Sequence, residues 1–419
     1  MSVTNPVVRR LLASRSRSAS HLRSSATSAS DMSKILGSPR PYISSPGRSK
    51  TAMFFPGQGV QRVGMLSPWL YAFPSTSREF IDELDSCMGY KFSDIIQSGP
   101  SSRLNATVNA QPAIMATSLL ILRILERNFN FNTSQSIDYT LGHSLGEFAA
   151  LVAGGYLSFQ DSLRIVHRRA AVMADATERA EAATPGSTYG MVAIITEPEY
   201  LASLIHTISS IVGENVCDWS HTPFEGQVCI ANVNSKNQIV LSGSITGISR
   251  VLDRVRLFSG HDPQALRLNS DTPFHSPLMR PAGEAVYKML SRPGTIAFPG
   301  RIQCISNISA RPFNSPEELA DLVSRAGVEP VRWADSIRYL NEKAQVRRWI
   351  GIGPGQVGRN LVGKEIGIRG TDRSRNAGVW GISKPEDIDE VLRGLEDTDS
   401  AMPMPISDFA MQSICGTAA

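Results

Sequence analysis

The sequence predicts an α/β protein in which a smaller ferredoxin-like α+β subdomain is inserted into a larger domain with a largely parallel sheet. From residue 51 onward, short apolar runs that end in proline or glycine alternate with stretches of helical spacing. Between residues 188 and 269 the order changes to β-α-β-β-α-β, the ferredoxin-like pattern. With 419 residues, of which 42% are hydrophobic, the chain has enough apolar material for both cores. We expect a leader over residues 1–50, the larger domain over 51–187 and 270–395, the small subdomain over 188–269 and a tail over 396–419.

The elements of the larger domain are predicted from apolar spacing and from the residues that end each run. Residues 51–55 form a short apolar run that stops at Pro56 and Gly57, as a buried strand entering a loop does. Ser158 opens a capping box, which marks the start of a helix. The further elements are helices over 111–128, 145–153 and 158 to about 179, and a strand over 136–141.

The small subdomain is predicted in the same way, from strand-like runs that alternate with two helical stretches. Its strands are expected over 189–196, 228–234, 238–242 and 264–269, and its helices over 198–211 and 245–258.

The leader has a composition of its own. Residues 1–50 hold nine Lys and Arg, fourteen serines and a single acid. This segment therefore has a net charge of +8, and the rest of the chain has −4, which gives the total of +4. Arginine- and serine-rich, acid-poor composition is typical of an organelle transit peptide, most often mitochondrial, and predicts a location in the mitochondrial matrix. The alternative is a disordered basic tail without an address. Because the leader is excluded from the fold, we expect a chain that begins near Ser49 to fold and be active.

Three classes of protein are disfavoured. The basic charge belongs to the leader, so it does not indicate that the folded body binds nucleic acid. No stretch of about 18 uncharged apolar residues is present, and we therefore expect no membrane span. The five cysteines are scattered and form no C-x-x-C pair, which argues against a disulfide framework and against a zinc site.

The central motif is Gly142-His143-Ser144-Leu145-Gly146, a G-x-S-x-G between a predicted strand and a predicted helix. Such a turn presents a serine in an exposed, strained position and aims it at the N-terminus of the helix, where unpaired N–H groups can hold an oxyanion. The alternative is a tight turn in which Ser144 only caps the helix. The context favours Ser144 as a nucleophile.

A serine nucleophile needs a base, and His275 is the best placed of the seven histidines. It lies between Pro273 and Pro277, before a helix and after the inserted subdomain, where the chain has returned to the larger domain. The alternative is a capping or core histidine. No acid is placed as an obvious third member of a triad.

Arg169 lies in the middle of an apolar stripe on the helix that Ser158 opens. A charge at such a position is costly unless it meets an anion, and a guanidinium suits a planar carboxylate. The alternative is an internal salt bridge to a core carboxylate. The stripe consists of Ile165, Val166, Val172 and Met173, and the opposite side carries Arg164 and Arg168.

Six motifs together resemble the malonyl-CoA:acyl carrier protein transacylases and the related acyltransferase domains of fatty acid and polyketide synthases. The resemblance covers roughly residues 51–395. In order, the motifs are FPGQGVQ (55–61), GHSLGE (142–147), NVNS with QIVLSG (232–235 and 238–243), FHSPLM (274–279), PVRW (330–333) and GPG (353–355).

The resemblance implies an α/β-hydrolase-like larger domain and a role for each matching residue. Ser144 would take the acyl group and His275 would be its base and then the acid. The backbone N–H groups of Gln58 and Leu145 would form the oxyanion hole. Arg169 would bind the free malonyl carboxylate.

Further positions follow from the same resemblance. Asn232 and Gln61 would contact the substrate. A main-chain carbonyl near Arg325 or Ala326 would steer the imidazole in place of a carboxylate. The chain departs from the family at Gly351, Gly358 and Asn360, which puts local packing or partner contact in question more than chemistry.

The implied reaction transfers malonyl from malonyl-CoA to the phosphopantetheine thiol of acyl carrier protein through a malonyl-serine intermediate, for fatty acid synthesis. It needs no metal and no bound cofactor, and we expect a monomer from a eukaryotic mitochondrion. Two alternatives stay open at this point: a serine hydrolase or thioesterase that uses the same turn, and a carrier-binding subunit without catalytic activity. The preference between malonyl and methylmalonyl is open as well.

Overall fold

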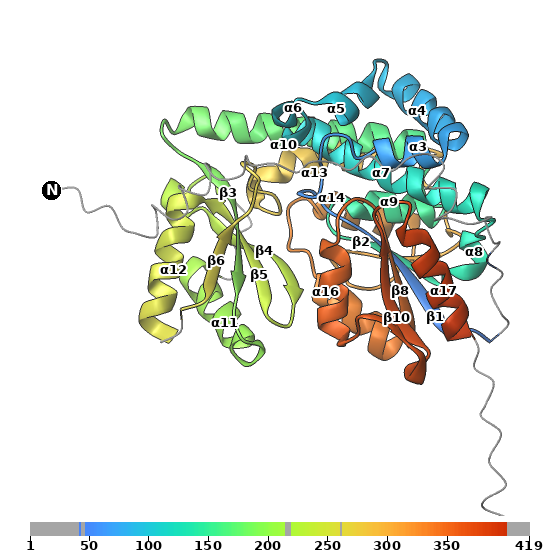
Figure 1. Ribbon diagram of the computed structural model, residues 1–419. Coiled ribbons are helices and arrows are strands. Elements are labelled where there is room, and N and C mark those ends of the chain that lie inside the picture. The colour runs from blue at the N-terminus through green and yellow to red at the C-terminus, as the bar shows by residue number, and fades with distance from the viewer. Residues whose placement is uncertain (1–41, 43–46, 214–218, 260–261, 400–419) are drawn as a thin grey trace, which may run out of the picture.

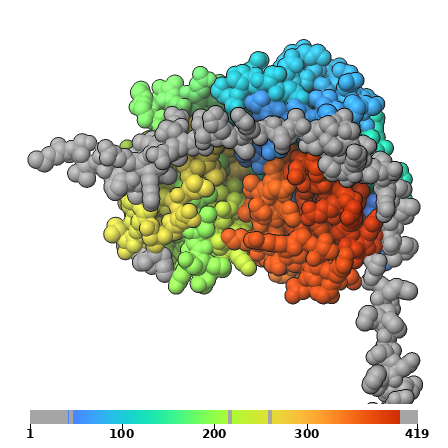
Figure 2. All heavy atoms as spheres, viewed as in Figure 1, coloured from blue at the N-terminus to red at the C-terminus, as the bar shows by residue number. Residues whose placement is uncertain are grey.

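The computed structural model describes residue 42 and residues 47–213, 219–259 and 262–399. The expected leader up to residue 41 and the tail from residue 400 lie outside these residues. Within them the chain forms a larger α/β domain and a small α+β domain, side by side (Figure 1). In the space-filling view the green and yellow small domain lies against the orange and red part of the larger one (Figure 2). This mixed α/β architecture is the fold class that the sequence predicts.

The central sheet is parallel except at one edge, where β9 and β10 pair antiparallel. β1 lies in the middle and its last residue, Phe55, is opposite Gly142 at the end of β2. The spatial order is β7 (Gln303–Ile305), β2 (Tyr139–Gly142), β1 (Lys50–Phe55), β8 (Val346–Ile352), β10 (Ala377–Ile382) and β9 (Gly370–Asp372).

Helices cover both faces of this sheet. Successive side chains of a strand point to opposite faces, and in β1 the side chains on both faces are apolar and pack against helices. Phe55 packs in one core with α7 (Thr107–Asn128) and α9 (Gly146–Ala153), whereas Phe54 packs in a second core with α15 (Trp333–Arg338) and α16 (Val357–Ile366). Burial on both faces explains why the first strand is continuously apolar instead of alternating.

The remaining helices of the larger domain lie mostly above the sheet in Figure 1. α10 begins where the capping box predicts, with Ser158 Oγ accepting the N–H of Asp161 at 3.0 Å, and it extends past the expected end at Arg179. These helices are α3 (Ser67–Ala72), α4 (Pro74–Met88), α5 (Phe92–Ser98), α6 (Ser101–Asn105), α8 (Thr133–Ser136), α10 (Phe159–Ala183), α13 (Arg280–Leu290), α14 (Pro316–Arg325) and α17 (Asp387–Asp399).

Among the described residues, α7 is the one helix long and apolar enough to cross a membrane by length and composition. Of its apolar window, however, 89% is buried inside the protein. Such burial is typical of the core helix of a globular domain.

The small domain has the predicted ferredoxin-like order. Its antiparallel sheet is arranged β4-β5-β3-β6, and two helices pack on one face in a separate core. The elements are β3 (Tyr189–Ile195), α11 (Leu201–Val212), β4 (Val228–Ser235), β5 (Gln238–Ser244), α12 (Ile245–Ser259) and β6 (Gln264–Arg267).

Several bounds of the sequence prediction are wrong; the helix expected from residue 111, for example, begins at Thr107. The strand expected to begin at residue 136 begins at Tyr139, because the side chain of Asn132 accepts the N–H of Gln135 and caps the short helix α8 instead. The larger domain also continues past residue 395, since α17 runs to Asp399.

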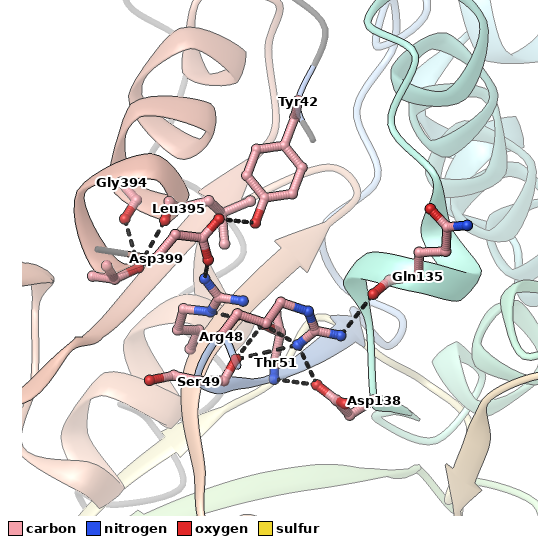
Figure 3. A network of polar contacts seen from close by, with 11 residues as sticks. Tyr42, Arg48, Ser49, Thr51, Gln135, Asp138, Gly394, Leu395 and Asp399 are labelled. Atoms are coloured by element: carbon pink, nitrogen blue, oxygen red, sulfur yellow. Dashed lines mark hydrogen bonds and ion pairs between the residues drawn. The ribbon is translucent and has the colours of Figure 1, made fainter. Parts of the chain in front are cut away.

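The expectation that nothing before Ser49 contacts the core is also wrong. Tyr42 is 3% exposed, its ring stacks on Phe131 and its hydroxyl donates to Asp399 at 2.9 Å. Arg48 forms an ion pair with Asp138 at 2.6 Å. Figure 3 shows Tyr42, Arg48, Asp138 and Asp399 in a network of polar contacts near Thr51. The end of the expected leader is therefore part of the folded domain.

Candidate active site

Ser144 lies on a tight turn between β2 and α9, and the turn holds it in a left-handed conformation with φ of 52°. The glycines of the motif are required by close approach: a Cβ on Gly142 would lie 1.9 Å from the main chain of Gly146, and a Cβ on Gly146 would lie 2.5 Å from the carbonyl oxygen of Phe55. A serine in this strained position at a strand-to-helix turn is a nucleophile elbow.

The structure brings His275 to this serine. Its Nε2 lies 2.8 Å from Ser144 Oγ, and its backbone is also left-handed, with φ of 56°. The main-chain N–H of His275 donates to the carbonyl of Gly327 at 3.1 Å, which anchors the loop. A serine hydroxyl hydrogen-bonded to an imidazole is the arrangement that nucleophilic catalysis needs.

The imidazole is held in its neutral form. Burial above all, and then the positive charge of Arg169 and the nearby His143, lower the pKa of His275 to about 3, while backbone groups of Ala326 and Glu329 act in the opposite direction. Its Nδ1 has no hydrogen-bond partner among the described residues. Among the described residues no carboxylate is hydrogen-bonded to this base. The backbone of Ala326, one of the two positions at which a steering carbonyl was expected, is close enough to raise the pKa of His275 but not hydrogen-bonded to Nδ1.

The two expected oxyanion donors are free to donate. Neither the N–H of Gln58 nor that of Leu145 donates to an acceptor in the described part of the chain, and Leu145 stands at the N-terminus of α9. Unpaired N–H groups at a helix N-terminus favour negative charge.

A cavity of about 280 Å³ lies between the two domains and contains Ser144 and His275 in its wall, with Gln58 and Asn232. Two buried side-chain oxygens in this wall, Gln58 Oε1 and Asn232 Oδ1, have no partner among the described residues and are available to a ligand. Gln61 does not line the cavity. Its side chain accepts the N–H of Gly59 and donates to Asn105, so it braces the loop.

Arg169 is 3% exposed on α10 and does not line the cavity, but it is close enough for its positive charge to lower the pKa of His275. One guanidinium nitrogen donates to Gln111 Oε1 at 2.6 Å, and the described residues give it no carboxylate partner in an ion pair. Burial lowers its pKa to about 10, which the charge of Glu147 partly offsets, so it stays protonated near neutrality. Among the described residues Arg169 thus forms no direct ion pair, although the buried carboxyl of Glu147 is close enough to act on its charge.

Two residues that the sequence did not single out support the nucleophile. The side chain of Asn307 contacts the elbow, and Glu147 lies fully buried beneath it. Glu147 closes the GHSLGE motif, but Asn307 stands 163 residues after Ser144 and carries no motif of its own. Only the pairing of β7 with β2 brings it to the site.

The fold and the site define a serine enzyme with a nucleophile elbow, a neutral histidine base and a buried arginine. Comparison with known proteins narrows this class. An acyl transferase domain model matches residues 53–207. The malonyl CoA-acyl carrier protein transacylase of Bacillus subtilis (strain 168) is 32% identical over 355 residues, which cover 84% of this chain and 100% of that protein. The chain belongs to the malonyl CoA-acyl carrier protein transacylase family.

Solved structures agree with this membership. The acyl-carrier-protein-S-malonyltransferase from Bartonella henselae has a TM-score of 0.67 at 30% identity, over 83% of this chain and 99% of that one. A malonyl-transacylase in complex with a type II PKS acyl-carrier protein has a TM-score of 0.67 at 26% identity, over 83% of this chain and 100% of that one.

Proposed function

We propose that this protein is an acyl-carrier-protein S-malonyltransferase, which moves a malonyl group from malonyl-CoA to the phosphopantetheine thiol of acyl carrier protein. The observation that carries the proposal is the 2.8 Å contact between Ser144 Oγ and the neutral His275, beside a buried arginine that has no carboxylate partner among the described residues. In this proposal Ser144 is the nucleophile, His275 the base and Arg169 the receptor of the distal carboxylate.

In the first half-reaction, Ser144 Oγ attacks the thioester carbonyl while its proton passes to His275 Nε2. The N–H groups of Gln58 and Leu145 donate to the oxygen that becomes negative. The carbon–sulfur bond then breaks, the coenzyme A thiol leaves with the proton from His275, and a malonyl-serine ester remains.

In the second half-reaction, the carrier's thiol takes the place of coenzyme A. Its proton passes to His275, its sulfur attacks the ester, and the bond between the acyl carbon and Ser144 Oγ breaks as the serine regains a proton. Asn232 Oδ1, which has no partner among the described residues, would accept an amide N–H of the pantetheine arm common to both substrates.

Arg169 supplies selectivity for the distal carboxylate. A buried guanidinium without a direct ion pair would gain from a substrate anion, and among the described residues only one of its N–H groups is hydrogen-bonded, to Gln111.

The setting of the reaction is part of the proposal. The composition of residues 1–50 supports a mitochondrial matrix location, where the protein would supply malonyl groups to fatty acid synthesis. We further propose that it acts as a monomer, with no metal or bound cofactor, because the two half-reactions need only groups of the chain and its two substrates.

Mass spectrometry after brief mixing with malonyl-CoA tests the function. Wild type should gain one malonyl group, release one coenzyme A and pass the group to acyl carrier protein, whereas Ser144→Ala should fold but gain no mass. Free malonate formed in place of the acyl-carrier product would indicate a hydrolase. An unmodified wild type that still binds the carrier would indicate a non-catalytic subunit.

A further inference from the structure

Asn307 joins the two sides of the nucleophile turn. Its Oδ1 accepts the main-chain N–H of Ser144 at 2.9 Å, and its Nδ2 donates to the carbonyl of Gly142 at 2.8 Å. The last main-chain pair between β7 and β2 is Ile305 with Leu141. Beyond that point the amide side chain takes over the hydrogen bonds that a neighbouring strand would have made.

The main chain of Asn307 is fixed as firmly as its side chain. Its N–H donates to Glu147 Oε1 at 2.8 Å, and its carbonyl accepts the N–H of Arg332 at 2.9 Å. Asn307 is 3% exposed and Glu147 is 0% exposed. Every polar group of Asn307 is therefore paired, and two of the four pairs end on the residues that flank the turn.

The turn needs such an anchor. Ser144 has φ of 52°, a conformation that a non-glycine residue keeps only where its surroundings hold it. The same conformation sets the direction of Oγ toward His275 and leaves the N–H of Leu145 unpaired within the described residues.

We propose that Asn307 and Glu147 are positioning residues for acyl transfer: Glu147 holds Asn307, and Asn307 holds the Ser144 main chain so that the hydroxyl stays on His275. The hydrogen bonds of Asn307 end on Gly142, Ser144, Glu147 and Arg332, so the pair acts through the Ser144 turn. The inference rests on the proposed function for the reaction that it serves, but its geometry does not depend on the identity of the acyl donor.

The environment of Glu147 indicates which replacement it tolerates. Burial raises its pKa to about 7, while hydrogen bonds from Asn307 and the charge of Arg169 act in the opposite direction, and Cys304 also faces it. A carboxyl that is protonated so readily can be replaced by an amide, whose oxygen still accepts the N–H of Asn307.

The test measures the rate of Ser144 acylation per folded molecule. Asn307→Ala and the isosteric Asn307→Asp, which loses the Nδ2 donor, should lower the rate about 10²-fold, the cost of a displaced catalytic group, with little change in KM for malonyl-CoA. Glu147→Gln should stay within a few-fold of wild type, while Glu147→Ala should fall with the Asn307 variants. Asp85→Ala removes a buried acceptor of two hydrogen bonds on α4 and serves as the matched control.

A fluorophosphonate probe separates this inference from the proposed function. Ser144 Oγ attacks its phosphorus, the phosphorus–oxygen bond forms, fluoride leaves and the serine proton passes to His275. Slow labelling of the Asn307 variants supports positioning even if malonyl-CoA proves not to be the donor. Wild-type labelling and acylation rates in folded Asn307→Ala and Asn307→Asp, with only the melting temperature lowered as in Asp85→Ala, would overturn it.

Discussion

Arg169 is the residue at which acyl donors should be told apart. Acetyl-CoA and malonyl-CoA share the thioester, the pantetheine arm and the nucleotide, so only the distal carboxylate differs. A hydrogen bond to a charged group is worth roughly 1.5–3 kcal/mol, or about 10- to 150-fold. Arg169→Ala should lose at least that factor in kcat/KM for malonyl transfer and should spare acetyl transfer, measured with both donors.

The neighbouring arginines give the matched controls for this experiment. Arg164 and Arg168 lie on the exposed side of α10, so their alanine variants should behave like wild type. Arg169→Lys should be impaired because an ammonium cannot reproduce the planar fork. Equal losses for both donors in Arg169→Ala would make the arginine a structural residue.

The lowered pKa of His275 predicts an unusual pH dependence. A general base acts in its unprotonated form, and a pKa lowered to about 3 moves the acid limb of the rate far below the ordinary histidine value of about 6.5. As the pH falls from about 8 to about 5, the acylation rate should therefore show no decrease with an inflection near the ordinary histidine pKa of about 6.5.

Rapid-quench mass spectrometry across this range checks the prediction. Glu147→Gln should be measured beside wild type, since Glu147 is a buried group of the site whose pKa, raised to about 7, falls within this window. An inflection near pH 6.5 in both proteins would show that His275 titrates as an ordinary histidine.

At the scale of elements, two of the positions at which this chain departs from the family pattern, Gly351 and Gly358, pack against the same side chain. A Cβ on Gly351 of β8 would lie 2.6 Å from the ring of Phe54, and one on Gly358 of α16 would lie 3.0 Å from it. Phe54 is 2% exposed and has little room to move. The two glycines therefore make space for a large side chain on β1, and the departures are accounted for by packing.

This packing predicts strong coupling between two substitutions. Gly351→Ala should destabilise by about 1–3 kcal/mol through overpacking, and Phe54→Val should destabilise by leaving a cavity. Because the added methyl group fills part of that cavity, the double variant should be more stable than the sum of the single losses by about 0.5–3 kcal/mol. Urea unfolding of the four proteins gives the coupling, and additive losses would contradict it.

At the scale of the whole molecule, local patterns predicted the elements and the tight turn at Ser144, but not the contacts between distant segments. The first strand, the elbow and the capped helix α10 could be read from runs of neighbouring residues, as could the buried position of Arg169. Asn307 could not, because its role arises from the pairing of β7 with β2. The prediction placed Tyr42 in the leader because it used the composition of residues 1–50. Composition does not indicate contacts with distant residues, and Asp399, which Tyr42 contacts, is 357 residues away.

That contact predicts where the folded protein begins. Arg348 on β8 is 0% exposed and forms an ion pair with Asp399 of α17, and its Nε donates to Thr51. The hydroxyl of Tyr42 completes the same cluster from the N-terminal side (Figure 3). The cluster thus links the first strand to the last helix, and Tyr42 covers a buried charge.

Removal of residues 1–41 should therefore leave the melting temperature and the acylation rate unchanged, whereas removal of residues 1–48 should lower stability. Loss of a buried aromatic side chain costs about 3–5 kcal/mol in comparable cores, and a buried ion pair opened to solvent on one side adds to this. Tyr42→Phe in the full chain keeps the ring and loses one hydrogen bond, so it should cost only about 1 kcal/mol. Thermal unfolding of the three variants beside wild type orders these effects. If the chain that lacks residues 1–48 melted with the chain that lacks residues 1–41, the contacts of Tyr42 and Arg48 would contribute nothing, and the folded protein would begin at β1.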